Sequence, residues 1–242
     1  MVFMANPCSS SNMKKYSCTN CIKRNSSLLS ELSNDELDFL NSNRYTVSYK
    51  VGETICKEGT KSLGLICLNK GKVKMTRSSM NGSEQILTLK KPVDFIGFRT
   101  LMNDNTYLSS AVVLEDTTVC IIDKKVFFKV LANNEQLAFK IIRYLAQELD
   151  ELDDRMVNLF QKHVRARMAD ALLLINNIYG TNTNGTLAVS LRRLDIAALS
   201  NMTVSNVSRV LSSFSKEKLI ETNKRDIKII NLKALKSLSV FG

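Results

Sequence analysis

The stretch RRLDIAALSNMTVSNVSRVL, residues 192–211, decides the fold of the C-terminal third of this chain. Its apolar residues recur at helical spacing on both sides of Asn201, which predicts two short amphipathic helices joined by a tight turn. Asn is among the few residues other than Gly that enter the left-handed region at low cost, so it suits this turn. The hydroxyl of Thr203 is placed to cap the second helix. This is the layout of a helix-turn-helix motif.

Each helix of this motif has one face that is predicted to pack inward. In the first helix we assign that face to Leu194, Ala197 and Ala198, with Ile196 as a further candidate. In the second helix it consists of Val207, Val210, Leu211 and Phe214. The opposite face of the second helix has short polar side chains and one arginine, which suits a helix that lies in the major groove of DNA. The predicted DNA contacts are Thr203, Val204, Ser205, Asn206, Ser208, Arg209 and Ser212, and the alternative is a solvated polar face without a partner.

A predicted β-hairpin follows the motif. In LIETNKRDIKII, residues 219–230, two apolar runs flank a polar turn, which indicates a wing of two strands. Lys224 and Arg225 at its tip are predicted to contact the sugar-phosphate backbone of DNA. Asn231 is placed to cap a closing helix.

The charge distribution favours a nucleic-acid partner. The chain has 34 Lys and Arg against 23 Asp and Glu, a formal net charge of +11, and 12 of the basic but only 5 of the acidic residues fall within 163–242. A basic excess around the helix-turn-helix motif is what attraction to phosphates requires. A membrane surface would also attract this charge, but the chain lacks a basic amphipathic helix with bulky aromatic residues.

Nothing in the sequence predicts export or membrane insertion. The N-terminus MVFMANPCSSS lacks the apolar core of a signal peptide, and no run of consecutive apolar residues is longer than that at 171–175. We therefore expect a cytoplasmic protein with no membrane partner.

The part of the chain before the motif divides into three segments. Residues 1–27 are a polar arm that contains cysteines, and residues 28–133 are predicted to form a β-roll, because short apolar runs with a period near two alternate with glycines. Within the roll, Asn81-Gly82 predicts a hairpin turn. Residues 134–162 are predicted to form one long helix, and residues 163–242 form the DNA-binding domain. The fold class is therefore α+β.

The long helix has a heptad pattern of apolar residues that starts at Ala138 and is sustained to His163. A heptad repeat places its apolar residues in a narrow stripe along the helix, which is wide enough to contact one partner helix. The simplest partner is the same helix of a second subunit. The predicted dimerisation residues are Ile142, Leu145, Leu149, Leu152, Met156 and Leu159. The alternative is a helix that packs on its own β-roll. Carboxylates crowd the stretch 148–154, and like charges brought together across a dimer would weaken it.

The order of β-roll, long helix and winged helix-turn-helix resembles the CRP/FNR family of bacterial transcription regulators, over nearly the whole chain. The resemblance rests on YKVGETICKEGTKSLGLICLNKGKVKM, residues 49–75, on DFIGF at 94–98 and on TVSNVSR at 203–209. It implies a dimeric, sequence-specific DNA-binding regulator of a roughly palindromic operator that works with RNA polymerase. It also implies an effector pocket in the β-roll, at Phe95, Gly97, Phe98, Arg99, Leu108 and Ser109.

The same resemblance places the chain closer to the FNR-like branch than to the branch that binds cyclic AMP. Members of the latter have a Glu for the ribose and an Arg for the cyclic phosphate, where this chain has Phe98 and Leu108. Arg99, next to Phe98, is a cation that could be recruited to the phosphate. Because both of the expected positions are apolar, we nevertheless expect no physiological binding of cyclic nucleotides. A cyclic-nucleotide-responsive regulator remains the alternative. Both branches also have an acidic residue where this chain has Ser205, which changes the expected half-site.

The FNR-like branch implies an oxygen or redox sensor with an iron–sulfur cluster held by cysteines. The possible ligands in this chain are Cys8, Cys18, Cys21 and Cys120. A further N-terminal ligand of the family falls on Ser27, which supplies no thiolate. The alternative is a cluster-free protein whose internal cysteines are small core residues.

Two other classes of protein fit the sequence less well. An enzyme with Cys18 or Cys21 as nucleophile would need a nearby base, and the single histidine is far away in the sequence. An architectural DNA-binding protein would bind with little sequence preference. We expect no enzymatic activity.

Overall fold

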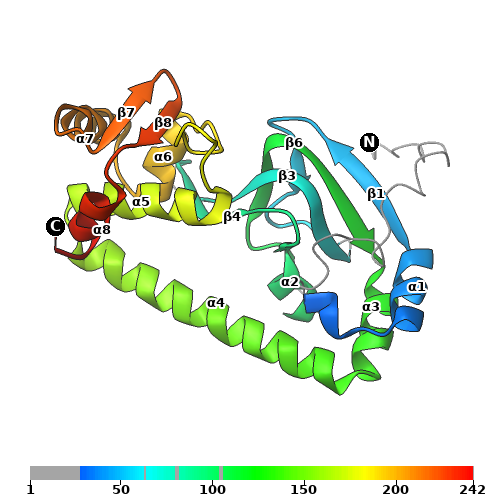
Figure 1. The fold of residues 1–242 in the computed structure, drawn as a ribbon. Helices are drawn as coiled ribbons and strands as arrows, with labels where there is room; N and C mark the ends of the chain where they lie inside the picture. The colour runs from blue at the N-terminus through cyan, green and yellow to red at the C-terminus, as the bar shows by residue number, and fades with distance from the viewer. Residues whose placement is uncertain (1–27, 63, 80–81, 104–105, 242) are drawn as a thin grey trace.

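Two lobes joined by one long helix make up the protein (Figure 1). The computed structural model describes residues 28–241 except 63, 80–81 and 104–105. The N-terminal lobe is an antiparallel sheet with short helices beside it, and the C-terminal lobe consists of helices and a two-stranded sheet. The predicted α+β class, with a β-roll, a long helix and a winged helix-turn-helix, is confirmed.

Six antiparallel strands of the described residues form the sheet of the N-terminal lobe. They are β1 (Arg44–Tyr49), β2 (Thr54–Cys56), β3 (Leu65–Ser78), β4 (Glu84–Lys90), β5 (Phe95–Ile96) and β6 (Ser110–Ile122). Their order is β1-β6-β3-β4, with β2 also paired to β6 and β5 to β3. The β3–β4 hairpin exists, but its loop spans 79–83 and is longer than a two-residue turn, since Ser78 pairs with Glu84. Asn81 of the predicted turn lies outside the described residues.

Alternation along the strands gives the sheet two apolar faces. The short helices are η3 (Leu28–Glu31), α1 (Asn34–Ser42), α2 (Phe98–Asn103) and α3 (Lys124–Ala132). Leu65 and Ile122 belong to the core that these helices share with the sheet. Ile66 and Ile121, one residue away on the same strands, belong to the core on the other face.

Helix α4 (Glu135–Gln161) runs from the N-terminal lobe to the C-terminal lobe (Figure 1). The side chain of Asn134 caps it by accepting a hydrogen bond from the Leu137 amide at 2.8 Å. The helix ends before His163, which is the N-cap of the next helix but makes no side-chain cap bond. Leu137 and Ile141 are its only buried residues, so most of this helix packs on neither lobe.

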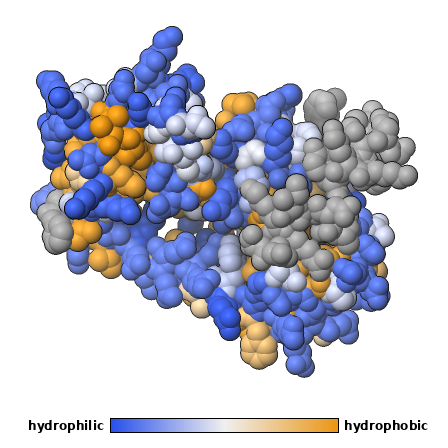
Figure 2. All heavy atoms as spheres, viewed as in Figure 1, coloured by the Kyte–Doolittle hydropathy of each residue, from blue (hydrophilic) through white to orange (hydrophobic). Residues whose placement is uncertain are grey.

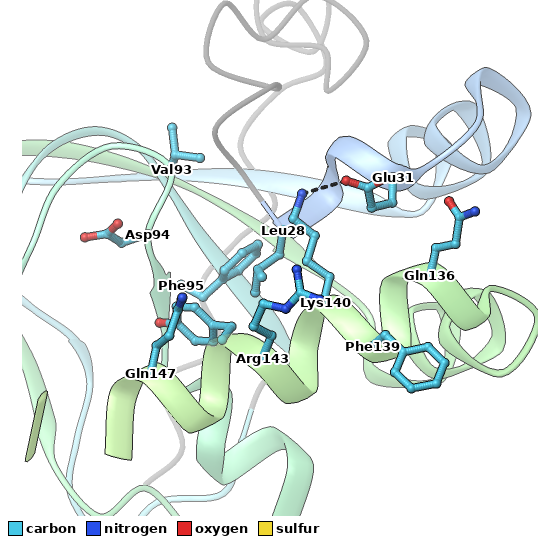
Figure 3. A pocket seen from close by; sticks show the side chains of 11 residues that line it. Leu28, Glu31, Val93, Asp94, Phe95, Gln136, Phe139, Lys140, Arg143 and Gln147 are labelled. Atoms are coloured by element: carbon cyan, nitrogen blue, oxygen red, sulfur yellow. Dashed lines mark hydrogen bonds and ion pairs between the residues drawn. The ribbon is translucent and has the colours of Figure 1, made fainter. Parts of the chain in front are cut away.

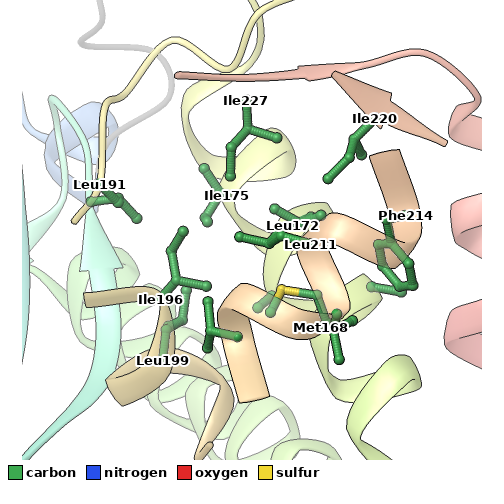
Figure 4. Close-up of a cluster of buried hydrophobic side chains, with 14 of the residues drawn as sticks. Met168, Leu172, Ile175, Leu191, Ile196, Leu199, Leu211, Phe214, Ile220 and Ile227 are labelled. Atoms are coloured by element: carbon green, nitrogen blue, oxygen red, sulfur yellow. The ribbon is translucent and has the colours of Figure 1, made fainter. Parts of the chain in front are cut away.

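The C-terminal lobe is built on a compact apolar core (Figure 4). Its elements are α5 (Val164–Tyr179), α6 (Arg193–Ser200), α7 (Val204–Lys216), β7 (Ile220–Asn223), β8 (Asp226–Ile229) and α8 (Leu232–Phe241). Asn231 caps α8 through the Ala234 amide at 2.9 Å, as predicted. Among the helices described, none combines the length and apolar character needed to cross a lipid bilayer.

The two lobes also contact each other directly, through the β3–β4 hairpin, which the sequence did not indicate. Ile86 and Leu89 of β4 are buried in the core of the C-terminal lobe. Beside them, Lys74 of β3 donates a hydrogen bond to Asp195 of α6 at 2.9 Å, and both side chains are only 4% exposed. Arg155 of α4 donates to the Ile86 carbonyl at 2.9 Å and to the Leu199 carbonyl at 3.2 Å. A buried ion pair and an arginine therefore fix the relative position of α4, α6 and the hairpin.

Candidate nucleic-acid interface and effector pocket

Helices α6 and α7 meet at the predicted turn. Asn201 has φ 51° and ψ 52°, in the left-handed region, and ends α6. Thr203 caps α7 by accepting from the Asn206 amide at 3.2 Å. The predicted inward position of Leu194 is wrong, because this side chain is exposed, whereas Ile196, the further candidate for that face, is buried in the core. The helix is rotated because its first turn packs on the β3–β4 hairpin through Asp195, not only on its own lobe.

Helix α7 has the predicted buried and exposed faces. The buried residues are Val207, Val210, Leu211 and Phe214. The exposed side chains are Val204, Ser205, Ser208, Arg209 and Ser212. A hydrogen bond of 3.0 Å from Arg209 Nη2 to Asn206 Oδ1 lies along the surface of the helix and fixes the guanidinium there. The outer face of α7 thus presents small hydroxyls and one oriented cation to solvent, and the contact between the lobes does not cover it.

The wing lies beside this face. Strands β7 and β8 pair antiparallel around an exposed tip at Lys224 and Arg225, as predicted. Lys224 has a φ of 53°, a conformation that is unusual for a lysine. Its carbonyl accepts a hydrogen bond from Arg193 Nη2 at 3.1 Å, so the start of α6 holds the wing tip in place. The structure therefore brings the predicted DNA-contacting cations of α7 and of the wing onto one domain. In the view of Figure 2 the surface is mostly hydrophilic, with hydrophobic side chains gathered over this lobe.

All of the predicted effector-pocket residues line one small pocket of the N-terminal lobe, with a volume of about 60 Å³. They are Phe95, Gly97, Phe98, Arg99, Leu108 and Ser109. Pockets that bind cofactors or drug-sized ligands usually measure roughly 300–1,000 Å³, so this one is much smaller than such pockets. The buried Phe98 ring lines it and meets Tyr144 edge-on, with a distance of 5.9 Å between the ring centroids.

The predicted set left out seven of the residues that line this small pocket, and three of them, Lys90, Tyr144 and Glu148, interact with one another. Glu148 of α4 accepts hydrogen bonds from Lys90 Nζ at 3.2 Å and from the Tyr144 hydroxyl at 2.6 Å. Burial raises the pKa of Glu148, but the charge of Lys90, the hydrogen bonds from Tyr144 and Lys90 and the charge of Arg99 together outweigh it and hold the pKa below its usual range. Burial, and then the bond to Glu148, raise the pKa of Tyr144. The sequence showed Glu148 only as part of a run of carboxylates.

A larger pocket of about 690 Å³ lies between η3, the loop before β5 and α4 (Figure 3). Of the predicted effector residues only Phe95 lines it. Lys140 of α4 forms an ion pair of 2.8 Å with Glu31 across its wall. The larger opening therefore does not coincide with the predicted effector site.

Helix α4 exposes a stripe of large apolar side chains, which we call the α4 stripe. It consists of Phe139, Ile142, Leu149, Leu152, Met156, Val157 and Phe160. The list includes four of the predicted dimerisation residues, and Phe160 is 84% exposed. Leu145 instead packs, half-buried, against the core of the N-terminal lobe, and Leu159 is half-buried. The exposed stripe is thus turned slightly from the predicted one, because the first half of α4 lies on the lobe through Leu145 and its neighbours.

Among the four proposed cluster ligands, only Cys120 belongs to the described residues. Its thiol is buried and accepts a hydrogen bond from Arg44 Nη1 at 3.3 Å. Cys8, Cys18 and Cys21 lie outside the described residues. Within 28–241, apart from the undescribed positions, no three His, Cys, Asp or Glu residues are grouped so as to hold a metal.

Two domain families match the chain. Residues 46–134 match the cyclic nucleotide-binding domain, and residues 166–238 match the Crp-like helix-turn-helix domain. The first match covers nearly the whole sheet and the residues that line the small pocket except Tyr144 and Glu148. The second covers the two helices of the motif and the wing.

Similar whole proteins are transcription regulators. A CRP-like cAMP-activated global transcriptional regulator of Mycobacterium tuberculosis is 26% identical over 70% of this chain and 76% of its own length. The transcriptional activator protein FnrL of Cereibacter sphaeroides is 23% identical over 85% of this chain and 84% of its own. Among solved structures, FixK2 from Bradyrhizobium japonicum superposes with a TM-score of 0.72 at 25% identity, over 81% of this chain and 96% of that one.

Proposed function

This chain belongs to the CRP/FNR family of transcription regulators, and we propose that it acts as a homodimer on a roughly palindromic DNA operator in response to a signal other than cyclic AMP. It is a regulator and not an enzyme. As a regulator of transcription it has RNA polymerase as its proposed second partner.

One observation carries the proposal of sequence-specific binding: α7 presents Arg209, held by Asn206, on an exposed face of small hydroxyl residues. Arginine is the residue that most often contacts guanine in the major groove, through two hydrogen bonds. The absence of a carboxylate at Ser205 removes a potential acceptor for a cytosine amino group, so the half-site differs from that of relatives with an acidic residue there.

Genome-wide footprinting under oxic, anoxic and nitrosative conditions would give both the operator and the signal. On the operator that it returns, we expect Arg209→Ala to lose roughly 1–3 kcal/mol of binding free energy at fixed salt. Arg77→Ala, on the exposed end of β3, is the control and should bind as the unaltered protein does. Equal affinity of Arg209→Ala and the unaltered protein would refute the role of Arg209. Binding with little sequence preference would favour an architectural protein.

The α4 stripe supports the proposal of a homodimer. Apolar side chains exposed in a row along a helix for most of its length indicate a protein partner. The same helix of a second subunit is self-complementary, and two-fold pairing would place two α7 helices on successive turns of DNA. The carboxylates beside the stripe limit the strength of this dimer, which suits a regulator that changes state.

The small pocket supports a signal other than cyclic AMP. Phe98 and Leu108 offer neither an acceptor for a ribose hydroxyl nor a cation for a cyclic phosphate, and the pocket volume is about 60 Å³. Calorimetry with cyclic AMP should detect no binding. A low-micromolar affinity would overturn this and make the chain a cyclic-nucleotide-responsive regulator.

An iron–sulfur cluster is the alternative source of the signal, and it would act as a redox or oxygen sensor. Cys120 would be its internal ligand, and its thiol accepts a hydrogen bond from Arg44 Nη1. The remaining ligands would be Cys8, Cys18 and Cys21. Anaerobic reconstitution followed by visible absorption and iron analysis tests this, with Cys120→Ser as the matched variant. A colourless protein without iron would rule out the cluster.

A further inference from the structure

The small pocket already contains an anion that belongs to the protein. Lys90 of β4 and Arg99 of α2 are the two cations that line it, and Glu148 is its one carboxylate. The Glu148 carboxylate is hydrogen-bonded to Lys90, and its second oxygen lies 3.9 Å from Arg99 Nε. One carboxylate thus neutralises part of the charge of both cations, as the anionic group of a ligand would do.

These groups are well shielded from solvent. The side chain of Lys90 is 12% exposed and that of Glu148 is 25% exposed, whereas Arg99 at the rim is 49% exposed. Tyr144, one helical turn before Glu148 on α4, donates its hydroxyl to the same carboxylate oxygen as Lys90. Because shielded charges interact more strongly than solvated ones, an anion that enters this pocket meets strong repulsion from Glu148.

Glu148 also joins two parts of the protein that the proposed function needs to couple. Its cation partner Lys90 is on β4, and the apolar residue Leu89 of the same strand is buried against the C-terminal lobe. The next residue on α4, Leu149, belongs to the α4 stripe. A change in the position of Glu148 would therefore reach both the proposed dimer contact and the DNA-binding lobe.

We propose that Glu148 is a built-in occupant of the effector pocket: its carboxylate takes the cation site formed by Lys90 and Arg99, keeps anionic ligands out and ties α4 to the sensor lobe. This inference deepens the proposed function and rests on it for the link to DNA binding. A carboxylate of the protein itself thus occupies the position that the anionic group of a ligand would take. The exclusion of ligands with a phosphate group therefore depends on α4 as well as on the β-roll.

Two substitutions of Glu148 test this without DNA. Glu148→Gln keeps the shape but removes the charge, and we expect it to bind inorganic phosphate about tenfold more tightly than the unaltered protein, measured by calorimetry. Glu148→Ala leaves a space of carboxylate size, and we expect acetate to raise its melting temperature more than chloride does at equal ionic strength. Glu151→Gln and Glu151→Ala, at an exposed carboxylate on the same helix, are the matched controls and should show neither effect.

A substitution of Lys90 identifies where the anion binds. Adding Lys90→Met to either Glu148 variant should abolish the gain, because the cation that receives the anion is gone. Phosphate binding by Glu148→Gln no tighter than by the unaltered protein, or the same acetate effect in the Glu148 and Glu151 variants, would overturn the proposal. If Glu148→Ala fails to fold, Glu148→Gln decides the outcome alone.

DNA binding is measured separately on the footprinted operator. We expect Glu148→Ala to bind it about fivefold less tightly and to recover in acetate at constant ionic strength, because the acetate replaces the missing tie to α4. An unaltered protein that binds no operator at all would contradict the proposed function, whereas the phosphate and acetate results would still support or overturn the role of Glu148. An unchanged operator affinity in Glu148→Ala would overturn the coupling.

Discussion

Replacing Asp195 by Asn should loosen the contact between the two lobes. Asp195 lies on α6 of the DNA-binding lobe, and its carboxylate receives hydrogen bonds from Lys74 Nζ at 2.9 Å and from Arg192 Nε at 2.9 Å. Burial alone would raise the pKa of Asp195, but the bonds from Arg192 and Lys74 hold it below the usual range. The group is therefore an anion at neutral pH. An Asn has nearly the same shape and can still accept from the Arg192 amide, so the start of α6 stays capped.

The expected cost follows from the burial of Lys74. Removing one partner of a buried ion pair typically costs about 3–5 kcal/mol, because the other charge remains without compensation. Here Glu84 stays 2.9 Å from Lys74 Nζ. We therefore expect a loss of about 2–4 kcal/mol for Asp195→Asn. The cost cannot exceed the free energy that holds the lobes together, since they can separate instead.

Differential scanning calorimetry and urea denaturation followed by circular dichroism measure this effect. We expect the unaltered protein to melt in one transition and Asp195→Asn to melt in two, with the DNA-binding lobe first. Glu84→Gln is the control, because it removes the other anionic partner of Lys74. The side chain of Glu84 is 45% exposed, so this substitution should cost less than about 1 kcal/mol. The double variant Lys74→Met with Asp195→Leu should recover most of the loss, because apolar residues replace the buried pair.

Equal stability of Asp195→Asn and Glu84→Gln would contradict the conclusion that the buried Lys74–Asp195 pair holds the lobes together. The single variants Lys74→Met and Asp195→Leu complete the cycle: a loss in the double variant equal to the sum of their two losses would show that the residues act independently and would also contradict the role of the pair.

Two further predictions concern the α4 stripe and a surface ion pair. Leu149→Asp should give monomers in analytical ultracentrifugation and weaken operator binding, because a charge would face its copy across the two-fold axis; a dimer that persists would contradict the proposed seam. Hydrogen bonds from Arg165 and then Ser213 lower the pKa of Glu217 to about 2. Because this folded-state pKa lies below the ordinary value of 4.5, the stabilisation is complete above pH 4.5 and is lost as the pH falls towards 2. The difference in melting temperature between the unaltered protein and Glu217→Gln should therefore shrink over that range, and a constant difference would contradict it.

Local features that depend on neighbouring residues were predictable from the sequence. Asn201 and Thr203 define the turn and the cap of the motif through their own backbone and side-chain chemistry, and the structure has both. The extent of α4 followed from the change of period near Asn134. The resemblance to the family, and not local chemistry, grouped the six residues of the predicted effector pocket, and all six line one small pocket.

Features that depend on distant segments were not predictable in this way. Leu194 and Leu145 face differently from the prediction because a second surface, the hairpin or the N-terminal lobe, packs against each helix. A helical repeat shows that a face is apolar but not which of several surfaces covers it.

The sequence by itself determined the order of the elements, the chemistry of the recognition helix and the absence of the usual cyclic-nucleotide ligands, since these are properties of short stretches. The tertiary structure alone decided that Glu148 lines the small pocket and that Lys74 and Asp195 meet in a buried pair. Lys90 and Glu148 are 58 positions apart in the sequence, and Lys74 and Asp195 are 121 positions apart. Only the packing of the whole chain brings such distant residues together.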